Sequence, residues 1–281
     1  MQTLQTFEGK EFLKDVSNSQ LPTEDQIFCN TAFTIYSNHV SHVSELLNTI
    51  EKRNAEYGST QQAKDDENFF SLNKIEKARE ALKHTLHDLT QSLILKLENY
   101  FIKKYCLVFN SLLPDKGHTN LNPFSSYDPI IENITGQVGK NLLQAGKEQI
   151  NKNFLRSFNR NSVPVLNGNK ITIPNFITLD EHWGEKISLH YSYNSRLENL
   201  INALNLFLHD NTELPKQITD KLLEWKGALE LSDYYPVFPG VSFKFFKNRR
   251  IDVFFSNAET AKKFWNYYTL EAIETIFQEN D

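Results

Sequence analysis

The stretch VSFKFFKNRRIDVFF, residues 241–255, decides the fold class of the C-terminal half of this chain. Apolar and polar residues alternate through Val241–Phe245 in the run that ends at Lys247, and a second apolar run follows in Ile251–Phe255. Successive side chains of a strand point to opposite faces, so this pattern is typical of strands that bury one face. The polar residues Asn248–Arg250 between the runs predict a turn, and the stretch as a whole predicts a β-hairpin.

More strands are predicted upstream of this hairpin. Val163–Leu166 and Lys170–Ile173 are short runs with β propensity, and the glycine-centred Asn167–Asn169 between them is a strong turn signal. Ile187–Tyr191 alternates in the same way, and the polar residues Asp180–Trp183 before it predict a loop. We therefore expect a small antiparallel sheet.

Helices are predicted around these strands. Residues 130–158 carry apolar residues at helical spacing, with an interruption at Gly146. Further helices are expected at Ser195–His209, at Pro215–Leu229, and from a cap at Ser256 or Asn257 to about Phe277.

The N-terminal half predicts two long helices. Apolar residues recur at steps of three and four through Ala32–Gly58 and again through Leu72–Phe109. The polar segment 59–70 between them predicts a loop, and two amphipathic helices joined by a loop are typical of an antiparallel helical hairpin. Residues 1–30 are acidic and weakly patterned, so we expect a partly ordered lead-in.

The segment 114–129 is rich in Asn, Ser, Pro and Gly and is the best candidate for a boundary. The predicted organisation is a weakly ordered lead-in at 1–30, a helical hairpin at 31–113 and a second region at 130–281. The predicted fold class is α+β, with a long N-terminal helical hairpin and a C-terminal region of helices packed on a small antiparallel sheet.

Length and composition limit the function classes. The chain has 281 residues, 40% of them hydrophobic, and a formal net charge of −5. This allows a sizeable core and argues against a protein that coats nucleic acid along its whole surface.

Cys29 and Cys106 are isolated and flanked by apolar residues, which predicts reduced, packed thiols. Met1–Asp15 has no apolar signal core, and no run approaches the ~18 residues of a membrane span, so we expect a cytoplasmic protein that does not contact membranes.

Two His-x-x-His pairs on the predicted hairpin are candidate zinc ligands: His39 with His42, and His84 with His87. At ~100° per residue, His84 and His87 point away from the apolar stripe of their helix, which favours solvated side chains over a metal site.

Thr135–Asn141 faintly resembles a phosphate loop but lacks its glycine spacing and its hydroxyl residue.

Asp180, Glu181 and His182, beside Trp183, could perform acid–base chemistry or hold a metal ion. Residues of these types are also common in loops because they are soluble and favour turns. We therefore predict no catalytic residue, no metal site and no cofactor.

Basic residues give the one functional lead. The segment from Asn133 to Leu179 has one acid, Glu148, against Lys140, Lys147, Lys152, Arg156, Arg160 and Lys170. The C-terminal hairpin has no acid before Asp252 and contains Lys244, Lys247, Arg249 and Arg250. If both regions share a face, they form a basic patch that can bind the phosphates of DNA or RNA. The alternatives are a solvated rim, or lysines that protect an edge strand from pairing. The predicted nucleic-acid contacts are Lys140, Lys147, Arg156, Arg160, Lys244, Lys247, Arg249 and Arg250.

Four blocks in fixed order carry a family resemblance: GNKITIPN (168–175), Trp183 before an apolar strand, RLENL (196–200) opening a helix, and FKFFKN (243–248) followed by IDVFF (251–255). On these blocks, residues 130–268 resemble the bacterial family called domain of unknown function 4942. The resemblance implies a protein of plasmids, prophages or integrative elements, sometimes with a DNA methyltransferase fused or nearby. It implies no catalytic residue.

Two positions depart from the family. Arg249 stands where the family usually has glycine, so we expect either a left-handed, strained Arg249 or a different turn. Asn159–Ser162 stands where the family tends to have an aromatic-Lys-Thr-Asn run, which weakens any shared role for that segment.

Three hypotheses on function follow. The first is a non-enzymatic accessory protein of a mobile element that contacts DNA or RNA through the basic residues. The second is an interaction protein whose helical hairpin binds a protein partner, such as a host defence or DNA-modification component. The third is a hydrolase or nuclease with acids near Asp180–Glu185.

Overall fold

The computed structural model describes residues 21–58, 72–113, 121–181, 187–189, 195–215, 218, 231 and 233–269. The chain divides into two compact units. The helical unit comprises Met1–Phe101 and Phe109–Lys140, and the sheet unit comprises Ile102–Val108 and Asn141–Asp281. Several predictions fall outside the described residues: the lead-in up to residue 20, the loop at 59–70, nearly all of the helix at 215–229, and the last helix beyond residue 269.

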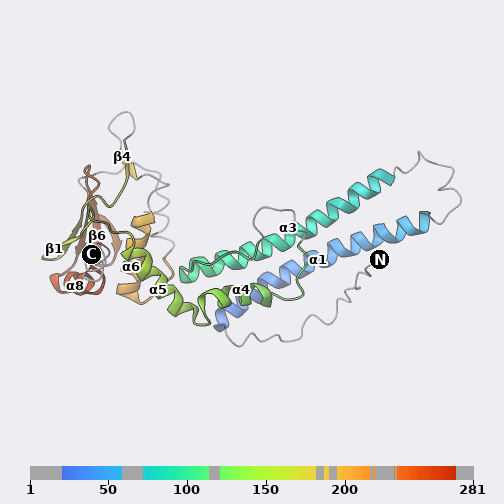
Figure 1. Cartoon of the computed structure of the whole chain (residues 1–281), viewed down its shortest axis with the longest axis horizontal. Coiled ribbons are helices and arrows are strands. Elements are labelled where there is room, and N and C mark those ends of the chain that lie inside the picture. The colour runs from blue at the N-terminus through green and yellow to red at the C-terminus, as the bar shows by residue number, and fades with distance from the viewer. Residues whose placement is uncertain are drawn as a thin grey trace, which may run out of the picture. The chain divides into compact units, whose positions relative to one another are not determined.

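Two long antiparallel helices form the helical unit's centre, α1 at Thr23–Gly58 and α3 at Leu72–Tyr105 (Figure 1). Near the start of α1, Tyr100 Oη donates a hydrogen bond to Asp25 Oδ1 at 2.8 Å, and the Tyr100 ring also stacks on Phe28 at 3.8 Å. Farther along α1, Tyr36 Oη lies 3.1 Å from Thr90 Oγ1 of α3. Residue numbers therefore rise along α1 where they fall along α3, so the two helices are antiparallel. The predicted helical hairpin is therefore confirmed.

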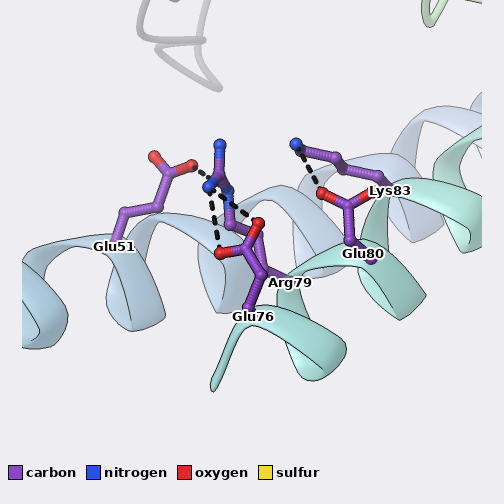
Figure 2. Close-up of polar contacts among 5 residues, drawn as sticks. All are labelled: Glu51, Glu76, Arg79, Glu80 and Lys83. Atoms are coloured by element: carbon purple, nitrogen blue, oxygen red, sulfur yellow. Dashed lines mark hydrogen bonds and ion pairs between the residues drawn. The ribbon is translucent and has the colours of Figure 1, made fainter. Parts of the chain in front are cut away.

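Charged side chains join the helices farther along α1. Arg79 of α3 lies between Glu51 of α1, at 3.5 Å, and Glu76, at 3.3 Å, and Lys83 pairs with Glu80 at 2.9 Å (Figure 2). All of these side chains are at least 36% exposed, and exposed pairs of this kind contribute at most about 1 kcal/mol each. Burial of the stripe between the helices is therefore the larger stabilising term.

The first helix begins at Thr23, so the prediction that it begins at Ala32 is wrong. The buried stripe of α1 continues toward the N-terminus through Cys29 and Asp25, both fully buried. Asp25 breaks the apolar pattern in the sequence. The Tyr100 hydroxyl bonds its carboxylate, which lets the helix bury a polar residue in an apolar position.

The second helix ends at Tyr105, earlier than the predicted Phe109. Cys106 follows with φ of 55°, in the left-handed region through which a right-handed helix does not continue. The Cys106 thiol donates to Thr212 O at 3.2 Å, which fixes this turn in the sheet unit.

The predicted helix at 130–158 is two helices, α4 at Asp128–Val138 and α5 at Leu142–Leu155. They separate at Gly139, where φ is 89°, so the predicted interruption at Gly146 is wrong. Gly146 lies buried inside α5, where a Cβ atom would stand 2.0 Å from Tyr105 O. The glycine therefore allows close approach of two backbone segments rather than a break.

A five-stranded antiparallel sheet forms the sheet unit's centre, in the order β1-β2-β7-β6-β5. Its strands are β1 at Val165–Asn167, β2 at Lys170–Ile173, β5 at Tyr235–Phe238, β6 at Val241–Phe245 and β7 at Ile251–Phe255. Both predicted hairpins, β1–β2 and β6–β7, are confirmed. Strand β5 has no counterpart among the predicted strands.

A separate two-stranded ribbon pairs β3, Leu179–Glu181, with β4, Ile187–Leu189. The prediction that Asp180 and Glu181 lie in a loop is therefore wrong, while His182 lies outside the described residues. Pairing with β4 explains the difference, because cross-strand contacts override the weak β propensity of acidic residues.

Helices cover one face of the large sheet. They are α5, α6 at Ser195–His209, and α8 at Ala258–Phe264, which continues as the π-helix η3 at Trp265–Thr269. The buried core between them includes Ile150, Phe154, Leu200, Leu204, Phe243, Val253, Phe264 and Tyr268.

The predicted α6 is confirmed, as is the cap of α8. The fold is α+β. In the part of the chain that the structure describes, no helix has the length and apolarity to cross a membrane.

Candidate functional site

The side of the sheet turned away from the core carries polar, charged and aromatic residues. Strand alternation sends Phe243, Phe245, Ile251, Val253 and Phe255 into the core, all at most 2% exposed. The residues between them, with their neighbours on β2, form the outer face: Lys170, Thr172, Ser242, Lys244, Asp252 and Phe254. The strand registers place these side chains next to one another, since Lys170 pairs with Phe254 and Lys244 pairs with Asp252.

Asp252 is the one buried acid of the outer face, with 2% of its side chain exposed. Its Oδ2 atom lies 3.1 Å from Lys170 Nζ, and its Oδ1 atom lies 3.3 Å from Arg250 Nε. A carboxylate removed from water needs cationic partners of this kind. Asp252 therefore fixes the positions of two cations that are themselves about one-third exposed.

Aromatic rings alternate with the cations. Lys244 Nζ lies 5.0 Å from the ring centroid of Tyr234 and 5.8 Å from that of Phe246, and Arg250 Cζ lies 3.6 Å from the Phe246 ring. Tyr234 meets Phe254 edge-on at 5.0 Å. Lys170 Nζ completes the circuit, 5.8 Å from the Phe254 ring. Together with Asp252 these residues form the cation–aromatic cluster: Lys170, Tyr234, Lys244, Phe246, Arg250, Asp252 and Phe254.

The hairpin tip, Phe246–Arg250, extends this surface. Arg249 N donates to Phe246 O at 3.0 Å, and Phe246 N donates to Arg250 O at 3.1 Å. Arg249 has φ of 64°, which is the first of the two alternatives expected at this position, a left-handed Arg249. Lys247 and Arg249 are exposed, and neither forms an ion pair with any residue that the structure describes.

The tip is tied to the segment after β2. Arg249 O accepts hydrogen bonds from Phe176 N at 2.9 Å and Ile177 N at 3.2 Å. The neighbouring Asn175 bonds Asn161 O through Nδ2 at 3.1 Å, and its own carbonyl accepts from Arg196 Nη1 at 3.2 Å. The turn that follows α5 and contains Arg160 therefore lies close to the hairpin tip.

The predicted contact residues divide into separate groups. Lys244, Lys247, Arg249 and Arg250 lie together, and Arg160 is one residue from the Asn161 carbonyl that Asn175 contacts. The other predicted residues are elsewhere. Lys147 of α5 pairs with Asp210 at 2.6 Å, and α5 packs on the inner face of the sheet. Arg156 caps the C-terminus of α5 and is exposed, and Lys140 is the last residue of the helical unit.

Several members of the cluster are not among the predicted site residues. Asp252 and Phe254 could be found in the sequence, because in β7 they alternate with the core residues Val253 and Phe255. Tyr234 gives no such signal, since it precedes a strand that the pattern does not predict.

The histidines of the hairpin do not converge. His39 Nδ1 lies 2.7 Å from Ile35 O, His87 Nδ1 accepts from Leu121 N at 3.2 Å, and His42 and His84 are exposed. The described residues contain no group of three or more His, Cys, Asp or Glu side chains that could hold a metal ion.

The two thiols are held protonated. Burial, with a smaller contribution from the nearby Asp25 carboxylate, raises the pKa of Cys29 to about 12. Burial likewise raises the pKa of Cys106 to about 12, with a smaller contribution from Glu198. A thiolate is the reactive form, so neither cysteine is an effective nucleophile near neutral pH.

The outer face gathers charged and aromatic side chains at one place. It offers cations held in place by a buried carboxylate, and half-exposed rings between those cations. Comparison of the chain with models of protein families, with curated proteins and with solved structures finds no match.

Proposed function

We propose that this protein binds nucleic acid through the outer face of its sheet and the hairpin tip. The observation that carries the proposal is the gathering of Lys170, Lys244 and Arg250 around a single buried acid, with exposed Lys247 and Arg249 beside them. The chain as a whole has a net charge of −5, so this positive surface is local. A local positive surface is what a phosphate backbone recognises.

The geometry favours binding because the cations are placed in advance. Asp252 holds Lys170 and Arg250 by ion pairs, and the Tyr234 and Phe246 rings hold Lys244. Side chains that are already ordered lose less conformational entropy when a ligand binds. Lys247 and Arg249 have no carboxylate partner among the described residues, so their charges are available to a phosphate.

The biological setting is a further part of the proposal. We propose a non-enzymatic, cytoplasmic accessory protein of a bacterial mobile element. This rests on the resemblance of residues 130–268 to domain of unknown function 4942, and on the ordered sequence blocks that carry it.

The other two functions have less support. Ile27, Ile35 and Leu46 of α1 are 61%, 49% and 56% exposed, which a protein partner of the helical hairpin could cover. Polar residues separate them along the helix, and single exposed apolar residues are common on soluble proteins. For a hydrolase or nuclease, the acids Asp180 and Glu181 lie on β3, and 182–186 lie outside the described residues.

The test compares binding of the full chain with that of two charge-reversal variants. Fluorescence anisotropy follows labelled single- and double-stranded DNA and RNA over a salt titration. The test variant is Lys247→Glu/Arg249→Glu. The matched control, Lys152→Glu/Lys262→Glu, makes the same change in total charge at exposed positions on α5 and α8, the helices that cover the inner face.

We expect salt-sensitive binding that the test variant loses and the control retains. Each lost phosphate contact should reduce the slope of log affinity against log salt by about 0.7 for a single strand. No binding at low salt, or equal losses in the two variants, would overturn the proposal.

A further inference from the structure

The rings of the cation–aromatic cluster are not needed to bind phosphate, and they point to a narrower class of ligand. Tyr234 is 56% exposed, and Phe254 and Phe246 are half-buried on the outer face. These rings form a group rather than single exposed residues, since Tyr234 lies 5.0 Å from Phe254 and Lys244 Nζ lies within 6 Å of both Tyr234 and Phe246.

The cations and rings of the cation–aromatic cluster follow one another in a fixed order. Lys170 on β2 and Lys244 on β6 lie on the two strands that flank β7, which carries Phe254. Lys170 stands opposite Phe254 and Lys244 stands opposite Asp252, so the two lysines lie in neighbouring cross-strand rows. The contacts join them through two rings: Lys170 Nζ lies 5.8 Å from the Phe254 ring, Phe254 lies 5.0 Å from Tyr234, and Lys244 Nζ lies 5.0 Å from the Tyr234 ring. A ligand that follows these contacts passes a cation, two rings and a second cation.

Such an order suits a ligand that presents both phosphates and flat, uncovered bases. In a duplex the base faces are stacked on one another, so only the cations of this surface could contribute. In a single strand every base exposes an aromatic face that can stack on a protein ring, and this contact tolerates any sequence.

Resting on the proposed function, we infer that the ligand is single-stranded nucleic acid, bound with bases against Tyr234 and Phe254 and phosphates on Lys170 and Lys244. Tyr234 supplies the most exposed ring, and its contact with the edge of Phe254 at 5.0 Å holds the two rings at different angles. Arg250, at 3.6 Å over Phe246, gives the surface a second flat element beside the tip.

The experiment uses an oligothymidylate of about 12 nucleotides, its uridylate counterpart, and an abasic strand of the same length with the same phosphates. A duplex of the same length completes the set. The full-length protein is measured by anisotropy as wild type, Tyr234→Ala and Tyr267→Ala. Tyr267 is the matched control, because it is 55% exposed but lies on η3, which packs with the inner face.

We expect the wild type to bind the thymidylate about 5- to 100-fold more tightly than the abasic strand, as stacking of one base contributes. Tyr234→Ala should remove most of that difference and weaken duplex and abasic binding less, because Lys244 keeps its contact with Phe246. Tyr267→Ala should preserve the difference. The uridylate arm shows whether the 2′-hydroxyl group changes the affinity.

The outcomes separate the two proposals. If wild type binds the abasic strand as tightly as the thymidylate, or if Tyr234→Ala lowers all affinities equally, the single-strand inference fails and nucleic-acid binding stands. If wild type binds none of the ligands at low salt, both proposals fail together.

Discussion

Arg249 has a strained backbone conformation at the tip that the proposed function uses. Its φ of 64° lies in the region that favours glycine, and an L-residue there costs roughly 1–2 kcal/mol. The strain is maintained by hydrogen bonds from Phe176 and Ile177 to the Arg249 carbonyl. Glycine would therefore adopt this backbone conformation without strain, so any advantage of arginine here comes from its guanidinium group.

Replacing this residue should separate stability from binding. We expect Arg249→Gly to raise the free energy of unfolding by about 0.5–1 kcal/mol, since the relieved strain exceeds the added entropy of the unfolded chain. The same variant should bind nucleic acid more weakly. Urea denaturation measures the first effect. Lys247→Gly is the control, because Lys247 is not among the left-handed residues and should gain nothing.

Gly146 differs from Arg249, because the lack of space for a side chain, and not the backbone angle, requires glycine there. A Cβ at this position would meet Tyr105 O at 2.0 Å, and a backbone atom cannot move aside cheaply. We expect Gly146→Ala to destabilise the protein by about 2 kcal/mol or more.

Gly136→Ala serves as the control for helix propensity, because α4 leaves open space there. It should stabilise by about 0.5–1 kcal/mol. Similar urea midpoints for the two alanine variants would mean that α5 does not approach Tyr105 as closely as described.

At the scale of the element, β7 combines a buried salt-bridged acid with core residues. Asp252 is 2% exposed and Asp210 is 79% exposed, although a lysine pairs with each at 3.1 and 2.6 Å. We expect Asp252→Asn to lower the free energy of unfolding by about 1–3 kcal/mol, because the half-buried Lys170 and Arg250 lose their anion. Asp210→Asn should change it by less than about 1 kcal/mol. Equal losses in chemical denaturation would contradict this account of β7.

The helical hairpin depends on a smaller polar network. Tyr36 Oη accepts a hydrogen bond from Phe124 N at 2.9 Å and lies 3.1 Å from Thr90 Oγ1. We expect Tyr36→Phe to destabilise the protein by about 1–3 kcal/mol, because Phe124 N and the buried Thr90 hydroxyl both lose this partner. The exposed Tyr267→Phe is the matched change, and its urea midpoint should stay at the wild-type value.

These elements also show how far the sequence predicts the fold. The hairpin β6–β7 follows from alternation, because both of its strands bury one face. The hairpin β1–β2 follows from its turn residues, since β1 has no buried residue. The start of α1 is missed because Asp25 occupies a core position, and its partner Tyr100 is distant in sequence.

The site is predicted in part. The basic tip is visible in the sequence because its residues are consecutive. Tyr234, Lys170 and Asp252 come together through strand pairing between distant segments, which no local pattern encodes.

At the scale of the whole molecule, each compact unit holds one of the chain's two cysteines, Cys29 in the helical unit and Cys106 in the sheet unit. Both have a pKa of about 12, against about 8.5 for an unfolded thiol. A thiol whose pKa is raised by folding stabilises the protein below the unfolded value. That contribution is lost as the pH rises from about 8.5 toward 12.

We therefore expect stability to fall as the pH rises from about 8 to about 10. Urea midpoints across this range measure the slope. A variant with Cys29→Ala and Cys106→Ala should be less stable overall, because it leaves cavities, but its slope should be shallower. Identical slopes would assign the pH dependence to other groups.

The alternation of residues between the outer and inner faces of the sheet has a consequence for how the sequence can evolve. In β2, β6 and β7 the core residues are odd-numbered, such as Ile171, Phe243 and Val253, and the residues of the outer face are even-numbered, such as Lys170 and Phe254. On the proposed function, selection for folding and selection for recognition therefore act largely on different positions of the same strands. Substitutions at the exposed even positions would then change the recognised ligand and leave the core as it is, whereas the buried Asp252 serves both. Loss or gain of one codon within a strand would exchange the two roles at once.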